Sequence, residues 1–219
     1  MKKTLLLAGV ACLLATSANA VMPQPYVSAK MRTSLMDNEF KWVDVDGSED
    51  SVSLDKNVIG GSFALGLRAP FSRGAWRNEI EYNINSNAEK KLTDGDGELD
   101  KLTLKSQALM FNSYLDVYTN TPLTPYFGGG IGFSSLKLSA KSISDPNATG
   151  DSIKNETNFA WQVGAGIACN VTYNVSVDLG YRYMNYGSFD KRIPDEGGYD
   201  KDTLKVRAHE IALGLRYTF

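Results

Sequence analysis

The sequence predicts an all-β fold, an eight-stranded antiparallel up-and-down transmembrane β-barrel. Three observations predict this architecture. Apolar and polar residues alternate along eight segments, which is typical of strands that have one apolar face. The links between these segments are alternately long and hydrophilic, or short. After residue 20, moreover, no run of residues is long and apolar enough to form a membrane-spanning helix.

The first 20 residues have the composition of a secretory signal peptide. They begin with the basic letters MKK, continue with a short apolar run and end on the small-x-small cleavage signal ANA. We therefore expect residues 1–20 to be removed and residues 21–219 to form one barrel domain. Loss of the two lysines takes the formal net charge from −2 to −4, and no basic stripe indicates a nucleic-acid partner. Only Cys169 then remains, which excludes a disulfide framework within the domain.

The first four predicted strands cover residues 26–35, 58–68, 76–85 and 104–118. In each of them every second residue is mostly apolar, and the residues between are small, polar or charged. The apolar positions are, in order, Val27, Ala29, Met31 and Leu35; Ile59, Phe63, Leu65 and Leu67; Trp76, Ile80, Tyr82 and Ile84; and Leu109, Phe111, Leu115 and Val117. The fourth segment is the least regular, because Met110 and Tyr114 fall on its polar face.

The last four predicted strands cover residues 125–138, 158–169, 175–184 and 209–219. Their apolar positions are Phe127, Ile131 and Phe133; Phe159, Trp161, Val163, Ala165 and Ile167; Val175, Val177, Leu179, Tyr181 and Tyr183; and Ile211, Leu213, Leu215, Tyr217 and Phe219. The opposite face of the fifth strand is mostly glycine. The eighth strand uses the last residue of the chain, which indicates that this end is tied into the sheet.

The connections between the strands differ by parity. Links from an odd to an even strand are long and hydrophilic, and they cover residues 36–57, 85–103, 139–158 and 186–205. Links from an even to an odd strand are short, at residues 69–75, 119–125 and 170–174. In an up-and-down sheet this puts all long loops on one side. An even strand number with this asymmetry is typical of a bacterial outer-membrane barrel, with long loops outside the cell and both mature termini in the periplasm.

A soluble exported barrel also alternates, but its apolar face surrounds a ligand and its outer face is charged. Here the second face consists mainly of small residues, which suit the narrow interior of eight strands. The charged residues predicted inside are Lys30, Arg32, Arg68, Arg77, Arg182 and Arg216, with Glu79, Glu81, Asp116, Asp178 and Glu210. Six cations nearly balance five anions, as buried charges require. We therefore expect a lumen filled by an interior charge network, although the soluble barrel stays an alternative.

Three stretches carry a resemblance to a known family. PYFGGGIGF, FAWQVGAGIACNVTYNVSVDLGYRY and HEIALGLRYTF resemble the strand motifs of the small eight-stranded outer-membrane barrels, which include opacity-type adhesins, OmpX and the OmpA membrane domain. In that superfamily the barrel-assembly machinery recognises a terminal aromatic strand. The resemblance therefore implies that Tyr217 and Phe219 form an assembly signal, and that outer-membrane lipid and lipopolysaccharide surround the protein. A membrane-interface role for Phe219 is compatible with this interpretation.

The sequence predicts no catalytic, cofactor or metal site. Its one histidine, His209, precedes Glu210, and successive strand residues point to opposite faces, so that they do not form a catalytic pair. The acidic stretches DGDGELD and DVDGSED have Leu99 and Glu49 where a calcium-binding loop needs glycine. Weak divalent-ion binding together with lipopolysaccharide phosphates is the alternative for these loops.

We interpret the chain as a monomeric surface protein whose function lies in its loops. Adhesion to a host or matrix receptor is the first hypothesis; a structural outer-membrane protein and a small low-conductance pore are alternatives. Few apolar side chains interrupt the hydrophilic loops, and aromatic residues supply much of the binding energy at interfaces. The candidate contacts are Phe40, Trp42, Phe189 and Tyr199.

Overall fold

The computed structural model describes residues 22–43, 49–53, 56–93, 99–142, 151–195 and 198–219. The predicted signal peptide and its cleavage site lie outside the described residues. So do residues 94–98 of the first acidic stretch and 44–48 of the second. In the described part of the chain, no helix is long and apolar enough to cross a membrane.

All regular structure in this part of the chain is β-strand. The ten strands are β1 (Gln24–Val43), β2 (Glu49–Ser53), β3 (Lys56–Phe71), β4 (Gly74–Asn85), β5 (Ala88–Thr93), β6 (Leu99–Val117), β7 (Leu123–Ser142), β8 (Asp151–Asn170), β9 (Val175–Asp195) and β10 (Gly198–Thr218). Eight of them form the wall in the order β1, β3, β4, β6, β7, β8, β9, β10, and β10 pairs with β1 to close it. β2 and β5 are short arms that pair with β1 and β6. The predicted fold class is confirmed.

The pleat of the barrel strands separates an apolar outer face from a polar inner face. On the outside Phe63 exposes 74% of its surface and Phe133 exposes 63%, whereas inside Glu81 and Glu210 are fully buried. The alternative of a soluble barrel with an apolar cavity is therefore wrong, because the large apolar side chains cover the outer wall. Such an apolar surface is stable in contact with lipid but not in contact with water.

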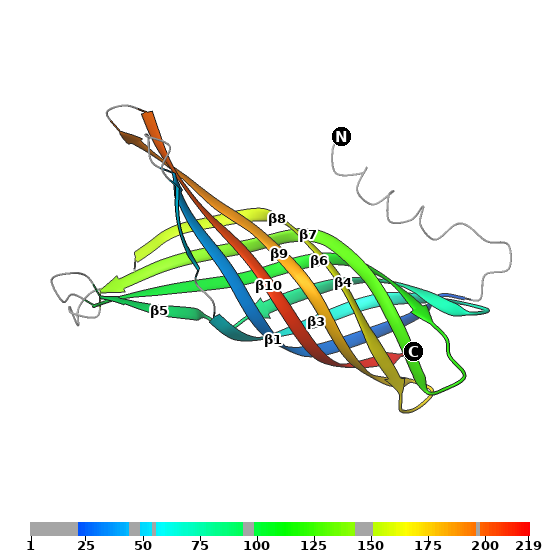
Figure 1. Ribbon diagram of the computed structural model, residues 1–219. Helices are drawn as coiled ribbons and strands as arrows, with labels where there is room; N and C mark the ends of the chain where they lie inside the picture. Colours follow the sequence, from blue (N-terminus) through cyan, green and yellow to red (C-terminus); the bar gives the residue numbers. More distant parts are fainter. Residues whose placement is uncertain (1–21, 44–48, 54–55, 94–98, 143–150, 196–197) are drawn as a thin grey trace, which may run out of the picture.

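The two ends of the barrel differ (Figure 1). At the turn end, short connections join β3 to β4, β6 to β7 and β8 to β9, and the C-terminus lies there. At the hairpin end, several strands continue well beyond the predicted bounds; β1 runs to Val43 and β9 to Asp195. Much of what the sequence indicates as loop is therefore strand. A ladder outside the membrane needs only backbone pairing, so it can continue through a hydrophilic stretch that composition alone indicates as loop.

The interior of the hairpin end holds an apolar plug that sequence reasoning missed. Its members come from seven strands of the wall, all except β4, and they are Met36, Val58, Leu104, Ala108, Met110, Leu136, Ala160, Met184, Tyr186, Val206 and Ala208. Several of them lie in segments predicted to be loops or on faces predicted to be polar. The plug caps the polar lumen from the hairpin side, so that the charged residues lie between it and the turn end.

Candidate functional site

The lumen contains two groups of ion pairs. The first, the central layer, lies beneath the apolar plug and consists of Lys30, Arg32, Glu79, Glu81, Arg182 and Glu210. The second, the turn-end layer, consists of Arg77, Asp116, Asp178 and Arg216. Ten of the eleven charged residues predicted inside the barrel thus form ion pairs with one another.

Arg182 holds the central layer together. Its Nε lies 2.6 Å from Glu210 Oε2, and its Nη1 lies 3.1 Å from Glu81 Oε2. Arg32 approaches the same Glu210 oxygen at 3.7 Å, and its side chain is fully buried. Tyr186 donates a hydrogen bond of 2.7 Å to the other oxygen of Glu210. Charges without solvent are stable only with such partners, so the layer is a structural unit in which each member depends on the others.

Lys30 and Tyr26 complete the central layer from β1. Lys30 Nζ lies 2.9 Å from Glu79 Oε1 and 3.6 Å from Glu81 Oε1. Tyr26 donates a hydrogen bond of 2.8 Å to Glu79 Oε2, and Asn112 donates one of 2.6 Å to Glu81 Oε2. Three cations therefore face three carboxylates, and the central layer is electrically neutral.

The turn-end layer pairs two arginines with two aspartates. Arg77 Nε bonds both oxygens of Asp116, at 2.8 and 2.9 Å, and Arg216 Nη2 lies 3.5 Å from Asp178 Oδ1. Arg68, the eleventh predicted member, is not in the network. It donates instead to Gln24 Oε1 at 2.7 Å and to the Tyr118 hydroxyl at 2.6 Å.

Tyrosines and amides, for which the alternation of the strands indicated no role, fill the remaining lumen. The Arg77 guanidinium lies 4.9 Å from the ring centroids of both Tyr114 and Tyr126. A Cβ at Gly66 would come within 2.3 Å of Tyr26, and one at Gly166 within 2.5 Å of the Tyr126 hydroxyl. The glycines on the inner face therefore make room for these rings. The position of these tyrosines on the polar face of their strands could have predicted that they fill the lumen.

The middle of the lumen is nearly solid. Between Lys30, Tyr114, Gln162 and Arg182 there is a void of about 30 Å³, which is close to the space that one water molecule occupies. This matches the expectation of a lumen filled by side chains.

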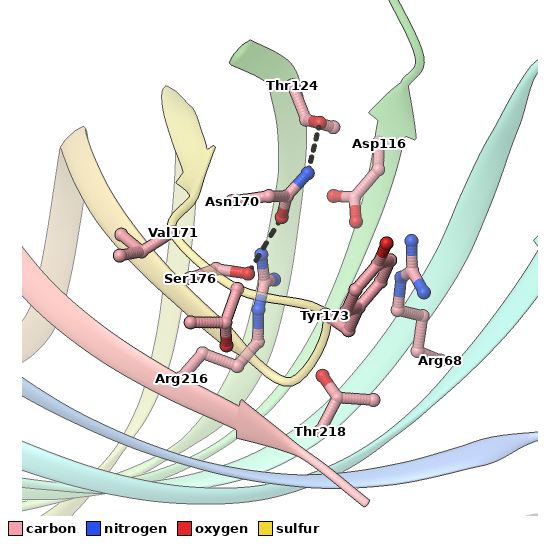
Figure 2. A pocket seen from close by; sticks show the side chains of 10 residues that line it. Arg68, Asp116, Thr124, Asn170, Val171, Tyr173, Ser176, Arg216 and Thr218 are labelled. Atoms are coloured by element: carbon pink, nitrogen blue, oxygen red, sulfur yellow. Dashed lines mark hydrogen bonds between the residues drawn. The ribbon is translucent and has the colours of Figure 1, made fainter. Parts of the chain in front are cut away.

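A larger cavity, the vestibule, opens at the turn end. Figure 2 shows the side chains that line it. The volume of the vestibule is about 680 Å³. Arg68, Asp116, Thr124, Asn170, Val171, Thr172, Tyr173, Ser176, Arg216 and Thr218 line it. Asn170 links two of these side chains, since it donates to Thr124 Oγ1 at 3.4 Å and accepts from Ser176 Oγ at 2.8 Å. The vestibule is therefore a polar chamber with two arginines in its wall.

The last residues of the chain are tied into the wall as predicted. Tyr217 pairs with Val27 of β1, and the Phe219 backbone N–H donates to the Pro25 carbonyl at 2.9 Å. The rings of Tyr217 and Phe219 lie edge to face, with centroids 5.1 Å apart, and both are exposed on the outer surface. Their role as an assembly signal stays a prediction.

His209 and Glu210 point to opposite sides of the wall. His209 lies on the outer surface, where its Nδ1 is 2.7 Å from the Tyr181 hydroxyl, whereas Glu210 is buried in the lumen. Among the described residues, no group of three or more histidine, cysteine, aspartate or glutamate residues is arranged to hold a metal ion.

The four candidate contact residues lie in strands and not in loops. Phe40 and Trp42 belong to β1, Phe189 to β9 and Tyr199 to β10. The backbone register places Phe189, Leu204, Phe40 and Val52 in one row across β9, β10, β1 and β2. Trp42 pairs with Asp202 on one side and Asp50 on the other. Register in the hairpin arms, and not proximity in sequence, brings these segments together.

Known proteins resemble this chain over most of its length. The family model described as "Outer membrane protein beta-barrel domain" matches residues 4–219. The outer membrane protein PagN of Salmonella typhimurium is 29% identical over 80% of this chain and 79% of its own length. A Rickettsia typhi protein named "Putative adhesin RT0816" is 26% identical over 99% of both chains. The crystal structure of Neisserial surface protein A shares the fold, with a TM-score of 0.51, 20% identity, and coverage of 89% of this chain and 97% of its own.

Proposed function

Because the chain belongs to the outer membrane protein β-barrel domain family, we propose that it is an adhesin that contacts a host or matrix receptor through its hairpin end. The protein resides in the bacterial outer membrane. In such barrels the short turns face the periplasm and the long connections face outward. The turn end and the vestibule are thus periplasmic, and the hairpin end is extracellular.

The extended β9–β10–β1–β2 sheet is the observation that carries this proposal. β1 remains paired with β10 as far as Val43 and Lys201, and β9 with β10 as far as Asp195 and Gly198. A paired sheet presents its side chains in a fixed arrangement, which lowers the entropy lost on binding compared with a flexible loop. The relative from Rickettsia typhi is named as an adhesin, which supports the same function for this chain.

The filled lumen favours adhesion over a transport function. Two ion-pair layers and the apolar plug occupy the interior, so the small-pore alternative would require these side chains to move. A purely structural outer-membrane protein remains the second candidate, since the same interior would serve it equally well. Only a binding measurement separates these two functions.

We also propose that the protein is not an enzyme. The single histidine lies on the outer surface beside Tyr181, separated by the wall from the buried carboxylates. A general base needs its substrate and its orienting group within hydrogen-bonding reach. We propose three partners for the protein. Lipopolysaccharide surrounds the wall, the barrel-assembly machinery acts during insertion, and a receptor binds at the hairpin end.

Attachment of cells that express single variants tests the adhesin proposal. Trp42→Ala and Tyr199→Ala each remove one aromatic side chain from the hairpin end, and we expect both to reduce attachment to host cells or matrix. Tyr173→Ala is the matched control, because Tyr173 is exposed on the periplasmic turn between β8 and β9. Unchanged attachment by both hairpin variants would favour the structural function.

A further inference from the structure

The interior charges are not evenly distributed along the lumen. The central layer has three cations and three carboxylates, whereas three arginines accompany two aspartates near the turn end: Arg68, Arg77 and Arg216 with Asp116 and Asp178. The surplus positive charge of the barrel interior therefore lies at the vestibule. We propose that the vestibule is a periplasmic binding site for an oxyanion, held by Arg216 and Arg68.

Arg216 has a free donor that the protein itself does not use. Only 4% of the residue is exposed, and its Nη2 lies 3.5 Å from Asp178 Oδ1. Its Nη1 is buried and has no hydrogen-bond partner among the described residues. Buried donors are nearly always paired, so this nitrogen is a donor that an acceptor beside Arg216 would satisfy. Figure 2 shows Arg216 among the side chains that line this chamber.

Among the described charged residues of the lumen, Arg68 is the cation for which no carboxylate partner is found. Its two hydrogen bonds go to neutral groups, the Gln24 amide oxygen and the Tyr118 hydroxyl. These contacts orient the guanidinium without neutralising it. Asp116 also lines the vestibule, but both of its oxygens accept from Arg77. An entering anion would thus meet a carboxylate that is already paired with Arg77, the Arg68 guanidinium, and the one unpaired nitrogen of Arg216.

The rest of the wall suits an oxygen-rich ligand. Thr124, Asn170 and Ser176 form a short hydrogen-bonded chain, and Thr172 and Thr218 add hydroxyl groups. The volume of about 680 Å³ lies within the range of small-molecule sites and exceeds what one small ion needs. Arginine binds carboxylate and phosphate groups through two parallel hydrogen bonds. The shared chemistry is therefore a carboxylate or phosphate, supplied by a cell-wall peptide terminus or by a free periplasmic anion.

Calorimetric titration of the folded mature barrel in detergent micelles tests this site. The probes are acetyl-D-alanyl-D-alanine, which ends in a carboxylate, its C-terminal amide, and inorganic phosphate. We expect the carboxylate or phosphate probe to bind and the amide not to bind. Binding of the peptide carboxylate alone assigns the cell-wall source, and binding of phosphate assigns a free anion. Absence of binding by both anions, or equal binding of the amide, would overturn the proposal.

Arg68→Gln is the decisive variant, because it removes a charge without leaving a carboxylate unpaired. We expect it to weaken binding of the anion by about tenfold or more, as loss of a charged hydrogen bond does. Arg73→Gln is the matched control, since Arg73 is exposed on the periplasmic turn between β3 and β4 and does not line the vestibule. Arg216→Gln should also weaken binding, and a detergent-gel mobility shift checks that it folds. Anion affinity unchanged in Arg68→Gln would contradict the assignment.

Discussion

Arg182 and Glu210 stand directly opposite each other on β9 and β10, and Arg182 Nε donates a hydrogen bond of 2.6 Å to Glu210 Oε2 inside the lumen. The same guanidinium reaches Glu81 on β4 at 3.1 Å. β4 and β9 lie four places apart in the closed order of eight wall strands, and so on opposite sides of the barrel. One side chain thus joins opposite walls across the lumen.

This contact predicts a large loss of stability in Arg182→Met. The substitution leaves Glu81 and Glu210 each with one cation fewer, and removal of one partner from a buried ion pair costs about 3 to 5 kcal/mol. A urea titration measures this loss of stability. Its midpoint is the urea concentration at which the fast gel mobility of the folded barrel disappears. Arg73→Met, at an exposed turn position, should change stability by no more than about 0.5 kcal/mol. Equal midpoints for the two variants would show that the network is dispensable.

The end of the chain predicts an assembly defect. Deletion of Phe219 removes the aromatic partner of Tyr217 and the backbone N–H that pairs with Pro25, while the other wall strands keep their sequence. We expect slow insertion and periplasmic degradation, measured as the amount of folded protein in outer-membrane fractions. Thr218→Ser, one residue earlier, should leave this amount nearly unchanged. Normal surface levels of the deletion variant would argue against a terminal recognition signal.

The filled lumen predicts the absence of stable, large conductance steps in planar bilayers. Opening a continuous path would require separation of the central layer and displacement of the apolar plug, and both changes expose paired or buried groups at a high cost in free energy. The conductance measurement should use refolded protein whose gel mobility shows that the barrel is closed. Long-lived, large steps from such a sample would contradict this description of the interior.

The sequence predicted the wall of the barrel well because a strand at a lipid boundary has two chemically different faces. Alternation alone placed Glu79, Glu81 and Glu210 inside and Phe63 outside, as the structure confirms. It did not predict which charges pair, because partners such as Arg182 and Glu81 come from opposite walls and depend on the stagger of the closed sheet. Arg68 illustrates the limit: its face was predicted correctly, but its partners are neutral.

The hairpin end was the less predictable part. Residues 36–43 and 186–195 continue as strands although the sequence predicts loops there. In the first segment Met36, Phe40 and Trp42 do alternate with charged residues, but the hydrophilic composition favoured a loop; in the second segment both alternate sets mix polar and apolar residues, so no period of two identifies it. The apolar plug was missed for a related reason. Met36, Leu136 and Val206 are isolated apolar residues in polar stretches, and only the closed barrel brings them together.

Trimming the hairpin end tests the central claim most directly. Each of the four extracellular hairpins would be shortened to a tight turn just above the apolar plug, leaving the wall, the ion-pair layers and the periplasmic turns intact. We expect the trimmed barrel to reach the outer membrane and to show the gel mobility of the folded protein, while attachment of expressing cells to host cells or matrix falls to the level of cells without the protein. Attachment that persists in full with the trimmed barrel would contradict the proposal that the hairpin end binds a receptor.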